Sequence, residues 1–255
     1  MGEEMNNRGQ IAIWIILAIV IVASIGVILL IKPQIIDGPL VESLDPRIYI
    51  SSCARQLTLN TLDEMMIHGG FVEPVNVISY KNTNVGYICK NTGDFQPCIN
   101  QHPLLLREMR EELLNQINPE IEECFDSLKD ELESRNAKVL LGEMKINSEF
   151  APDLVRININ REMNVEQGGN TKHFETFEFE FVHPVYDIVK VVNEIASQEA
   201  KYCSFEYLGY MLLYPDFDIR IAQLPDSNKI YTVKDIDSQK EMNVAIRSCA
   251  IPGGL

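Results

Sequence analysis

The sequence predicts an α+β protein in which a single N-terminal transmembrane helix precedes an extracytoplasmic domain of antiparallel sheets and helices. Three observations support this prediction. An uncharged apolar run covers residues 11–31, and all six cysteines follow it. The rest of the chain alternates between segments with helical periodicity and segments in which apolar and polar residues strictly alternate. Helices grouped beside antiparallel strands are typical of an α+β architecture.

Composition indicates a folded domain and excludes one class of partner. The 255 residues are 46% hydrophobic and 23% charged, which provides enough apolar surface for a sizeable core. The formal net charge is −15 at pH 7. Because proteins bind nucleic acid through clustered Lys and Arg side chains, we expect no nucleic-acid partner for so acidic a chain.

The apolar run from Ile11 to Ile31 is the strongest signal in the sequence. Its 21 residues include no charged side chain. At about 1.5 Å per residue, a helix of this length spans the roughly 30 Å hydrocarbon layer of a bilayer. The run is too long for the apolar region of a cleavable secretory signal, and no small-x-small cleavage site follows it. We therefore expect residues 10–32 to form a transmembrane helix that contacts lipid through residues 11–31.

The cysteines indicate which side of the membrane the domain occupies. Arg8 precedes the run and Lys32 follows it, so the flanking charges alone leave the orientation open. An even number of cysteines after the run is typical of a disulfide-linked exported domain. We therefore expect a single-pass cell-membrane protein with a cytoplasmic N-terminus and an extracellular C-terminal domain.

The disulfide pairing is a prediction of its own. Cys89 and Cys98 flank a short loop rich in turn residues, which brings two Cα atoms within disulfide range. For the other four cysteines we expect Cys53 with Cys124 and Cys203 with Cys249, one of several connectivities that six cysteines allow. Free buried thiols, which behave as small apolar residues, are the alternative.

The tripeptide Arg8-Gly9-Gln10, directly before the apolar run, resembles the class III signal peptide of archaeal type IV pilin-like proteins, archaellins included. The resemblance implies that a prepilin-type peptidase cleaves between Gly9 and Gln10 and removes residues 1–9, a cytoplasmic leader. It also implies that the mature helix is first a membrane anchor and later a packing element of a filament. Many pilins have Glu at the fifth mature position, where this sequence has Trp14, although archaellin-like members also lack that acid.

The first part of the exported chain predicts a linker, a helix and a hairpin. Residues 33–46 form the linker, and Asp45-Pro46 supplies an N-cap with proline at the first helical position. The helix covers residues 47–68 and stops at Gly69-Gly70. The strands VNVISY and VGYICK then flank residues 81–84, which we expect to form a four-residue turn.

Helices and strands alternate in the remainder. Pro103 and Pro119 each open a helix, and the two helices form a helical hairpin. Strict alternation then predicts an antiparallel meander that includes inward-facing Leu140, Val155 and Phe177. A further helix starts at Pro184, and strands follow at residues 219–224, 230–233 and 242–246. The exported part is one continuous domain or two lobes, 47–183 and 184–255.

No motif in the sequence predicts a catalytic or metal site. The four histidines are scattered, and no metal-ligand, nucleophile-elbow or phosphate-loop pattern occurs. Asp216-Phe217-Asp218 and Asp235-Ile236-Asp237 are the best candidates for Ca²⁺ ligands. Neither continues with the glycine and bidentate glutamate of an EF-hand loop, so solvated turn carboxylates are the preferred interpretation. We therefore expect no metal and no cofactor.

Three functions remain open. The preferred one is a membrane-anchored structural or interaction protein of the cell surface, a pilin-like precursor that assembles into a surface filament by self-association of its N-terminal helix. The alternative is a permanently anchored ectodomain that binds another envelope protein or a ligand. An envelope enzyme is disfavoured because the motifs that catalysis requires are absent from the sequence.

Overall fold

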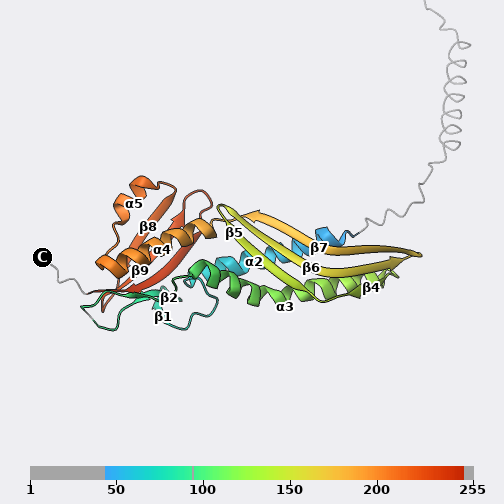
Figure 1. Ribbon diagram of the computed structural model, residues 1–255, viewed down its shortest axis with the longest axis horizontal. Coiled ribbons are helices and arrows are strands. Elements are labelled where there is room, and N and C mark those ends of the chain that lie inside the picture. The colour runs from blue at the N-terminus through green and yellow to red at the C-terminus, as the bar shows by residue number, and fades with distance from the viewer. Residues whose placement is uncertain (1–43, 94, 250–255) are drawn as a thin grey trace, which may run out of the picture. The chain divides into compact units, whose positions relative to one another are not determined.

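The computed structural model describes residues 44–93 and 95–249 (Figure 1). The chain from Asp45 onward forms one compact unit. Within the described residues it contains four helices and two sheets, which confirms a mixed α+β fold with antiparallel sheets. In that part of the chain, no helix combines the length and the apolar character that crossing a bilayer requires. The leader, the expected transmembrane helix at 10–32 and nearly all of the linker lie outside the described residues.

Helix α2, Pro46–Ile67, begins and ends as the sequence predicts. The Asp45 side chain caps it by accepting a hydrogen bond from the Arg47 amide at 2.9 Å. At its other end, Gly69 and Gly70 have φ values of 91° and 106°, a conformation that favours glycine. A Cβ atom on Gly69 would also lie 3.1 Å from the backbone nitrogen of Gly86. The helix therefore stops where the chain turns back against the following hairpin.

Helix α3, Leu105–Ser134, is a single helix of 30 residues, so the predicted helical hairpin is wrong. Pro119 lies inside it, on the exposed face. The apolar stripe continues in phase across the proline, because Leu113, Ile117 and Ile121 are spaced four residues apart and all are buried. Burial of this stripe against α2 outweighs the interior-proline cost of about 3 kcal/mol.

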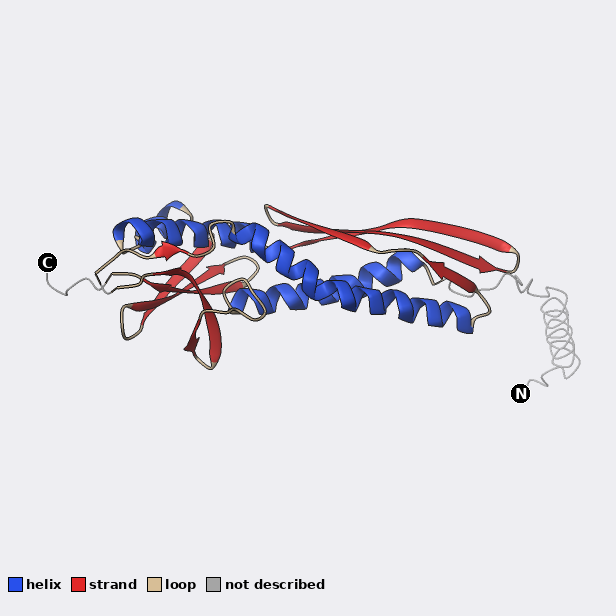
Figure 2. Ribbon diagram, turned by 60° about the horizontal axis from the view of Figure 1, so that its bottom comes forward, coloured by secondary structure: helices blue, strands red, loops and turns tan. Residues whose placement is uncertain are grey.

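The four-stranded sheet lies against the α2–α3 pair (Figure 2). Its central strand β6 (Leu154–Gln167) pairs antiparallel with β7 (Asn170–Val182) along one edge. Strands β4 (Lys138–Leu141) and β5 (Lys145–Ala151) share the other edge of β6, one after the other. Alternate residues of β6 face the helices, as predicted.

The position predicted for Leu140 is wrong by one residue. Val139 is buried, whereas Leu140 is 58% exposed. Strand β4 is short and is paired through Val139 with Val165 of β6, which faces the core. Because side chains alternate across a strand, this pairing turns Leu140 to the outside.

The six-stranded sheet combines segments from both halves of the chain, with strand order β1-β2-β10-β9-β8 and β3 beside β2. The strands are β1 (Val77–Tyr80), β2 (Thr83–Lys90), β3 (Ile99–Asn100), β8 (Phe217–Gln223), β9 (Asn228–Asp235) and β10 (Glu241–Arg247). Strand β2 pairs with β10 in parallel, an exception to the antiparallel pattern. The early hairpin and the last meander thus form one sheet, so the boundary expected at residue 184 does not separate two lobes.

The turn between β1 and β2 also differs from the prediction. Only Lys81 and Asn82 connect the strands, and both have positive φ, as in the tight type I′ turns that suit hairpins. Thr83 and Asn84 already belong to β2. The expected four-residue turn is therefore wrong.

Two further helices pack on the six-stranded sheet. Helix α4, Val185–Tyr202, follows Pro184 as predicted and buries residues such as Ile188 and Val192 against β9 and β10. Helix α5, Tyr207–Leu213, contacts the edge strand β8 and was not predicted. The Ile219 amide of β8 hydrogen-bonds Met211 Sδ on α5 at 3.1 Å, so α5 covers part of an otherwise open sheet edge.

Candidate functional site

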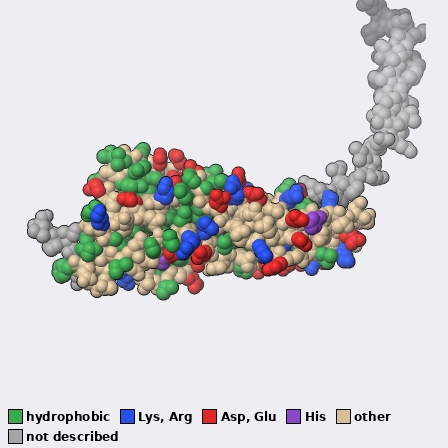
Figure 3. Space-filling view, in the orientation of Figure 1, with side chains coloured by type: hydrophobic (Ala, Val, Ile, Leu, Met, Phe, Trp, Pro, Cys, Tyr) green, Lys and Arg blue, Asp and Glu red, His purple; other side chains and the backbone are tan. Residues whose placement is uncertain are grey.

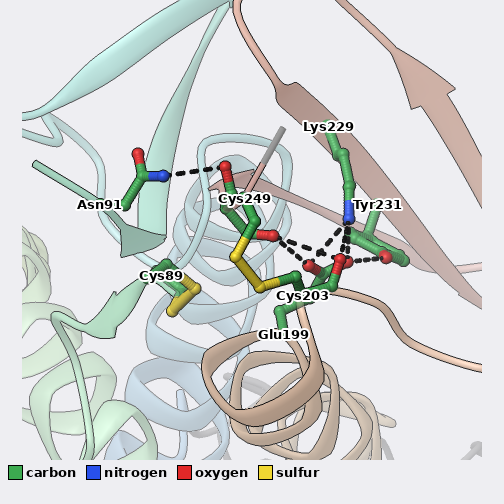
Figure 4. Close-up of polar contacts among 9 residues, drawn as sticks. Cys89, Asn91, Glu199, Cys203, Lys229, Tyr231 and Cys249 are labelled. Carbon is green, nitrogen blue, oxygen red and sulfur yellow. Dashed lines mark hydrogen bonds and ion pairs between the residues drawn. A yellow bond between two sulfur atoms is a disulfide. The ribbon is translucent and has the colours of Figure 1, made fainter. Parts of the chain in front are cut away.

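A buried polar cluster lies where α4, β9 and the segment after β10 meet (Figure 4). At its centre, Glu199 of α4 is completely buried. Lys229 Nζ lies 2.7 and 2.8 Å from the two carboxylate oxygens. Ser248 Oγ donates to the same carboxylate at 2.7 Å, and the Tyr231 hydroxyl donates a further short hydrogen bond. The carboxylate therefore has charged and neutral donors on both of its oxygens.

Local structure explains why these residues meet. Lys229 and Tyr231 are two apart on β9 and therefore point to the same face of the sheet, which α4 covers. Glu199 is in the last turn of α4, and Cys203 ends that helix in the left-handed conformation with φ of 57°. Lys229 Nζ donates to the Cys203 carbonyl at 2.9 Å. The same ammonium thus pairs with Glu199 and caps the helix.

The electrostatics of the cluster favour stable hydrogen bonds and an ion pair among its side chains rather than proton transfer. Burial, and then the charge of Glu199, raises the pKa of Tyr231, so its hydroxyl stays protonated and acts as a donor. The Lys229 ammonium balances the carboxylate charge. With both Glu199 oxygens already bonded, the cluster is arranged to hold three segments together.

The Cys203–Cys249 disulfide lies beside the cluster and covalently joins two of these segments, the end of α4 and the segment after β10 (Figure 4). Ser248 Oγ also donates to the Cys203 carbonyl at 3.3 Å. On the other side, Asn91 Nδ2 donates to the Ser248 carbonyl at 2.9 Å. The segment after β10 is therefore attached both to α4 and to the residue that follows β2.

All six cysteines are paired, and the pairs are those expected from the sequence. The Cys53–Cys124 disulfide joins α2 to α3 across 71 positions of sequence. Cys89 and Cys98 are only nine positions apart, and their disulfide closes a short loop. Disulfides form and persist in oxidising compartments. The domain therefore has the covalent structure of an extracellular protein or of one in another oxidising compartment.

A second polar junction, which the sequence analysis missed, connects α2 with both sheets. His183 lies between β7 and α4 and is buried, with Nε2 3.5 Å from Asp63 Oδ1 of α2. Lys240, between β9 and β10, pairs with the same carboxylate. His183 Nδ1 accepts a hydrogen bond from the Val185 amide at 3.2 Å, which leaves the proton of the neutral ring on Nε2, directed at Asp63.

Burial lowers the pKa of His183, and the nearby Lys240 charge lowers it further, while Asp63 opposes both effects. His183 comes directly before Pro184, between β7 and α4. Its contact with Asp63 could not be foreseen, because the two residues are 120 positions apart and meet only when α2 packs beside β7.

The acidic pairs considered as Ca²⁺ ligands lie on turns and strands. Asp235 Oδ1 accepts hydrogen bonds from the Ser238 amide and hydroxyl at 2.7 and 2.6 Å, which is a local turn arrangement. Asp218 forms an ion pair with Arg220 at 3.3 Å. Among residues 44–93 and 95–249, no group of three or more His, Cys, Asp and Glu side chains is placed to bind a metal ion.

An exposed apolar surface lies on α5. Leu208, Leu212, Leu213 and Tyr214 are 57%, 85%, 76% and 49% exposed, and none of the residues of the helix is buried. Figure 3 shows hydrophobic side chains gathered over α5, with acidic side chains beside them. We call these four residues the α5 surface. Its sequence is apolar on all sides of the helix, so periodicity did not reveal it.

The expected processing site, Gly9 and Gln10, lies outside the described residues. No family model matches the chain, and neither a curated relative nor a similar solved structure is found.

Proposed function

We propose that this chain is the precursor of a pilin-like cell-surface protein. A prepilin-type peptidase removes residues 1–9, the helix at 10–32 anchors the mature chain in the membrane, and self-association of that helix assembles a surface filament. The observation that supports this proposal is Arg8-Gly9-Gln10 placed directly before 21 uncharged apolar residues. Cleavage on the cytoplasmic side of such a run leaves the whole apolar helix on the mature protein.

The described domain is compatible with display outside the cell. Its three disulfides are suited to an oxidising environment. Its acidic composition also favours solubility and limits non-specific association. In this proposal the domain projects from the anchor or the filament and meets external partners.

A second candidate function is a permanently anchored ectodomain that binds another envelope protein. Two observations favour it. Trp14 occupies the position at which many pilins have Glu, and the α5 surface exposes three leucines on one short helix. The two candidates differ in whether the leader is removed and whether filaments form.

Mass spectrometry of the protein from native membranes separates the candidates. The pilin-like proposal expects a mature N-terminus at Gln10. A Gly9→Val variant should retain the leader, whereas a Gly2→Ala variant, altered within the leader but away from the cleavage point, should be processed normally. Reduction should raise the mass by six hydrogens, one pair for each disulfide.

A mature surface protein that still contains residues 1–9 would refute processing and favour the permanently anchored ectodomain. Electron microscopy of the cell surface supplies the second measurement. Filaments that disappear in the Gly9→Val strain and persist in the Gly2→Ala strain would support assembly through the processed helix. A cleaved protein that never forms filaments would refute assembly alone.

A further inference from the structure

We propose that the α5 surface is a docking site for a basic amphipathic segment of another protein. The inference goes beyond the proposed function and does not depend on it, because the α5 surface belongs to the disulfide-linked domain and would be present with or without cleavage after Gly9. Three features of the described residues support it: a rigid mounting, an outward row of leucines and an acidic border.

Helix α5 is held in place from its inner side. Met211 accepts a hydrogen bond from the Ile219 amide of β8, and the Tyr210 ring lies 5.4 Å from the Phe205 ring, measured between centroids. Phe205 is buried and lies 6.1 Å from the ring of Tyr231 in the polar cluster. The inner side of α5 is thus fixed to the core, and its outer side chains cannot turn inward without breaking these contacts.

The outer side of α5 exposes three leucines, each of them more than half accessible to solvent. Leu208 and Leu212 are four residues apart and lie on one face of the helix, with Leu213 beside them. Single exposed leucines are common on protein surfaces, but a contiguous group on a fixed helix is typical of an interaction site. Residues spaced in this way present a short apolar ridge, which matches the groove or apolar face of an amphipathic partner.

The border of the α5 surface decides the chemistry of the partner. Glu206 directly precedes the helix and its carboxylate accepts a hydrogen bond from the Gly209 amide at 3.3 Å, and Asp216 follows the helix. Within the described residues, neither of these carboxylates forms an ion pair with a Lys or Arg side chain. Figure 3 shows acidic side chains beside the hydrophobic side chains over α5.

Complementarity therefore favours Lys and Arg around the partner's apolar side chains. A second copy of this acidic chain would place carboxylates against carboxylates if it docked through the same surface. Anionic lipid headgroups would be repelled for the same reason. A basic amphipathic segment would pack its apolar side chains on the leucines and pair its Lys and Arg side chains with the acidic border.

A binding experiment with designed peptides tests the proposal. The full chain is reconstituted in phosphatidylcholine nanodiscs, and empty nanodiscs correct for binding of peptide to lipid. The probes are two fluorescent helical peptides with the same leucine face, one with lysines and one with glutamates on the polar face. Fluorescence anisotropy measures binding at low and high salt.

We expect the Leu/Lys peptide to bind the protein and the Leu/Glu peptide not to bind. Leu212→Gln with Leu213→Gln should weaken binding about tenfold or more, because two exposed apolar contacts are lost. Glu206→Gln with Asp216→Asn should weaken it several-fold and reduce its dependence on salt. Val75→Gln, which alters an apolar side chain that is 95% exposed elsewhere on the domain, should leave binding unchanged.

Near-ultraviolet circular dichroism and disulfide mapping establish that each variant is folded. The proposal is overturned if the Leu/Lys peptide binds no better than it binds empty nanodiscs, or if it binds the double leucine variant as tightly as the parent. Equal binding of the two peptides would refute the basic charge that the proposal assigns to the partner. Self-association that is abolished in the double leucine variant would identify a second copy as the occupant and would refute a basic partner.

Discussion

Replacement of Glu199 by Gln should destabilise the domain more than any exposed charge substitution. The change preserves the size of the side chain but removes the negative charge that Lys229 faces at 2.7 and 2.8 Å. Glu199 is completely buried and Lys229 is 12% exposed, so solvent cannot replace the lost partner. Breaking one side of a buried ion pair costs about 3–5 kcal/mol of unfolding free energy.

The structure allows this magnitude to be separated from a simple packing effect. In Glu199→Leu with Lys229→Met both charges are absent, so no buried ammonium remains without a counter-charge. This double variant should be more stable than Glu199→Gln, although the Tyr231 and Ser248 hydroxyls lose their acceptor. The matched exposed control is Glu111→Gln, whose partner Arg107 lies 3.6 Å away on the surface of α3 and which should change stability by less than about 1 kcal/mol.

Thermal unfolding of the full chain in a nonionic detergent, followed by tyrosine circular dichroism with the disulfides oxidised, measures the effect. For a domain of this size each kcal/mol lowers Tm by about 2–4 °C, so Glu199→Gln should lower Tm by roughly 10 °C. A decrease no larger than that of Glu111→Gln would refute the reasoning. So would a double variant less stable than Glu199→Gln, because unpaired charge would then not be the main cost.

Two further predictions concern α3 and the His183 junction. Pro119→Ala should raise the unfolding free energy by about 1–3 kcal/mol, because alanine restores a helical amide donor in a continuous α3; an unchanged or lower Tm would contradict one long helix. Because the pKa of His183 is lowered in the folded domain, the unfolded chain takes up the proton first as pH falls below about 6.5. Stability should therefore decrease between about pH 6.5 and the lowered pKa, and it should not depend on His183 above about pH 6.5. Comparison of Tm at pH 7.5 and about 5.5 should show a smaller decrease for His183→Gln than for the parent, whereas exposed His173→Gln should behave like the parent; equal decreases in all three would contradict the assignment.

Several elements were predictable because their signals are local. The cap at Asp45, the stop at Gly69-Gly70 and the helix start after Pro184 depend on a few neighbouring residues whose backbone preferences suffice to place them. Alternation likewise predicted β6 and the second half of β7, where every second side chain faces the core.

Local signals failed where distant contacts oppose them. Pro119 is typical of a helix start, yet the buried stripe on both sides of it keeps α3 continuous against α2. Leu140 has the expected character of a core residue, but the register of β4 with β6 selects Val139 instead. Helix α5 escaped detection because its apolar residues show no periodicity and its position depends on the edge of β8.

The candidate sites divide in the same way. Six cysteines in an acidic chain after an apolar run indicated an oxidised domain, and that conclusion needs only composition and order along the chain. The pairing of Glu199 with Lys229, and of His183 with Asp63, joins residues that are 30 and 120 positions apart. No pattern in the sequence marks those residues as partners.

The sequence by itself determined that this chain has an apolar N-terminal run with Arg8-Gly9-Gln10 before it, an α+β domain after it, and cysteines enough for three disulfides. The tertiary structure alone decided that β2 and β10 belong to one sheet, that Glu199 is buried with its donors, and that the α5 surface remains exposed. The reason is physical. Backbone preferences and periodicity act over a few residues, whereas burial and charge pairing are settled only when distant segments compete for the same core.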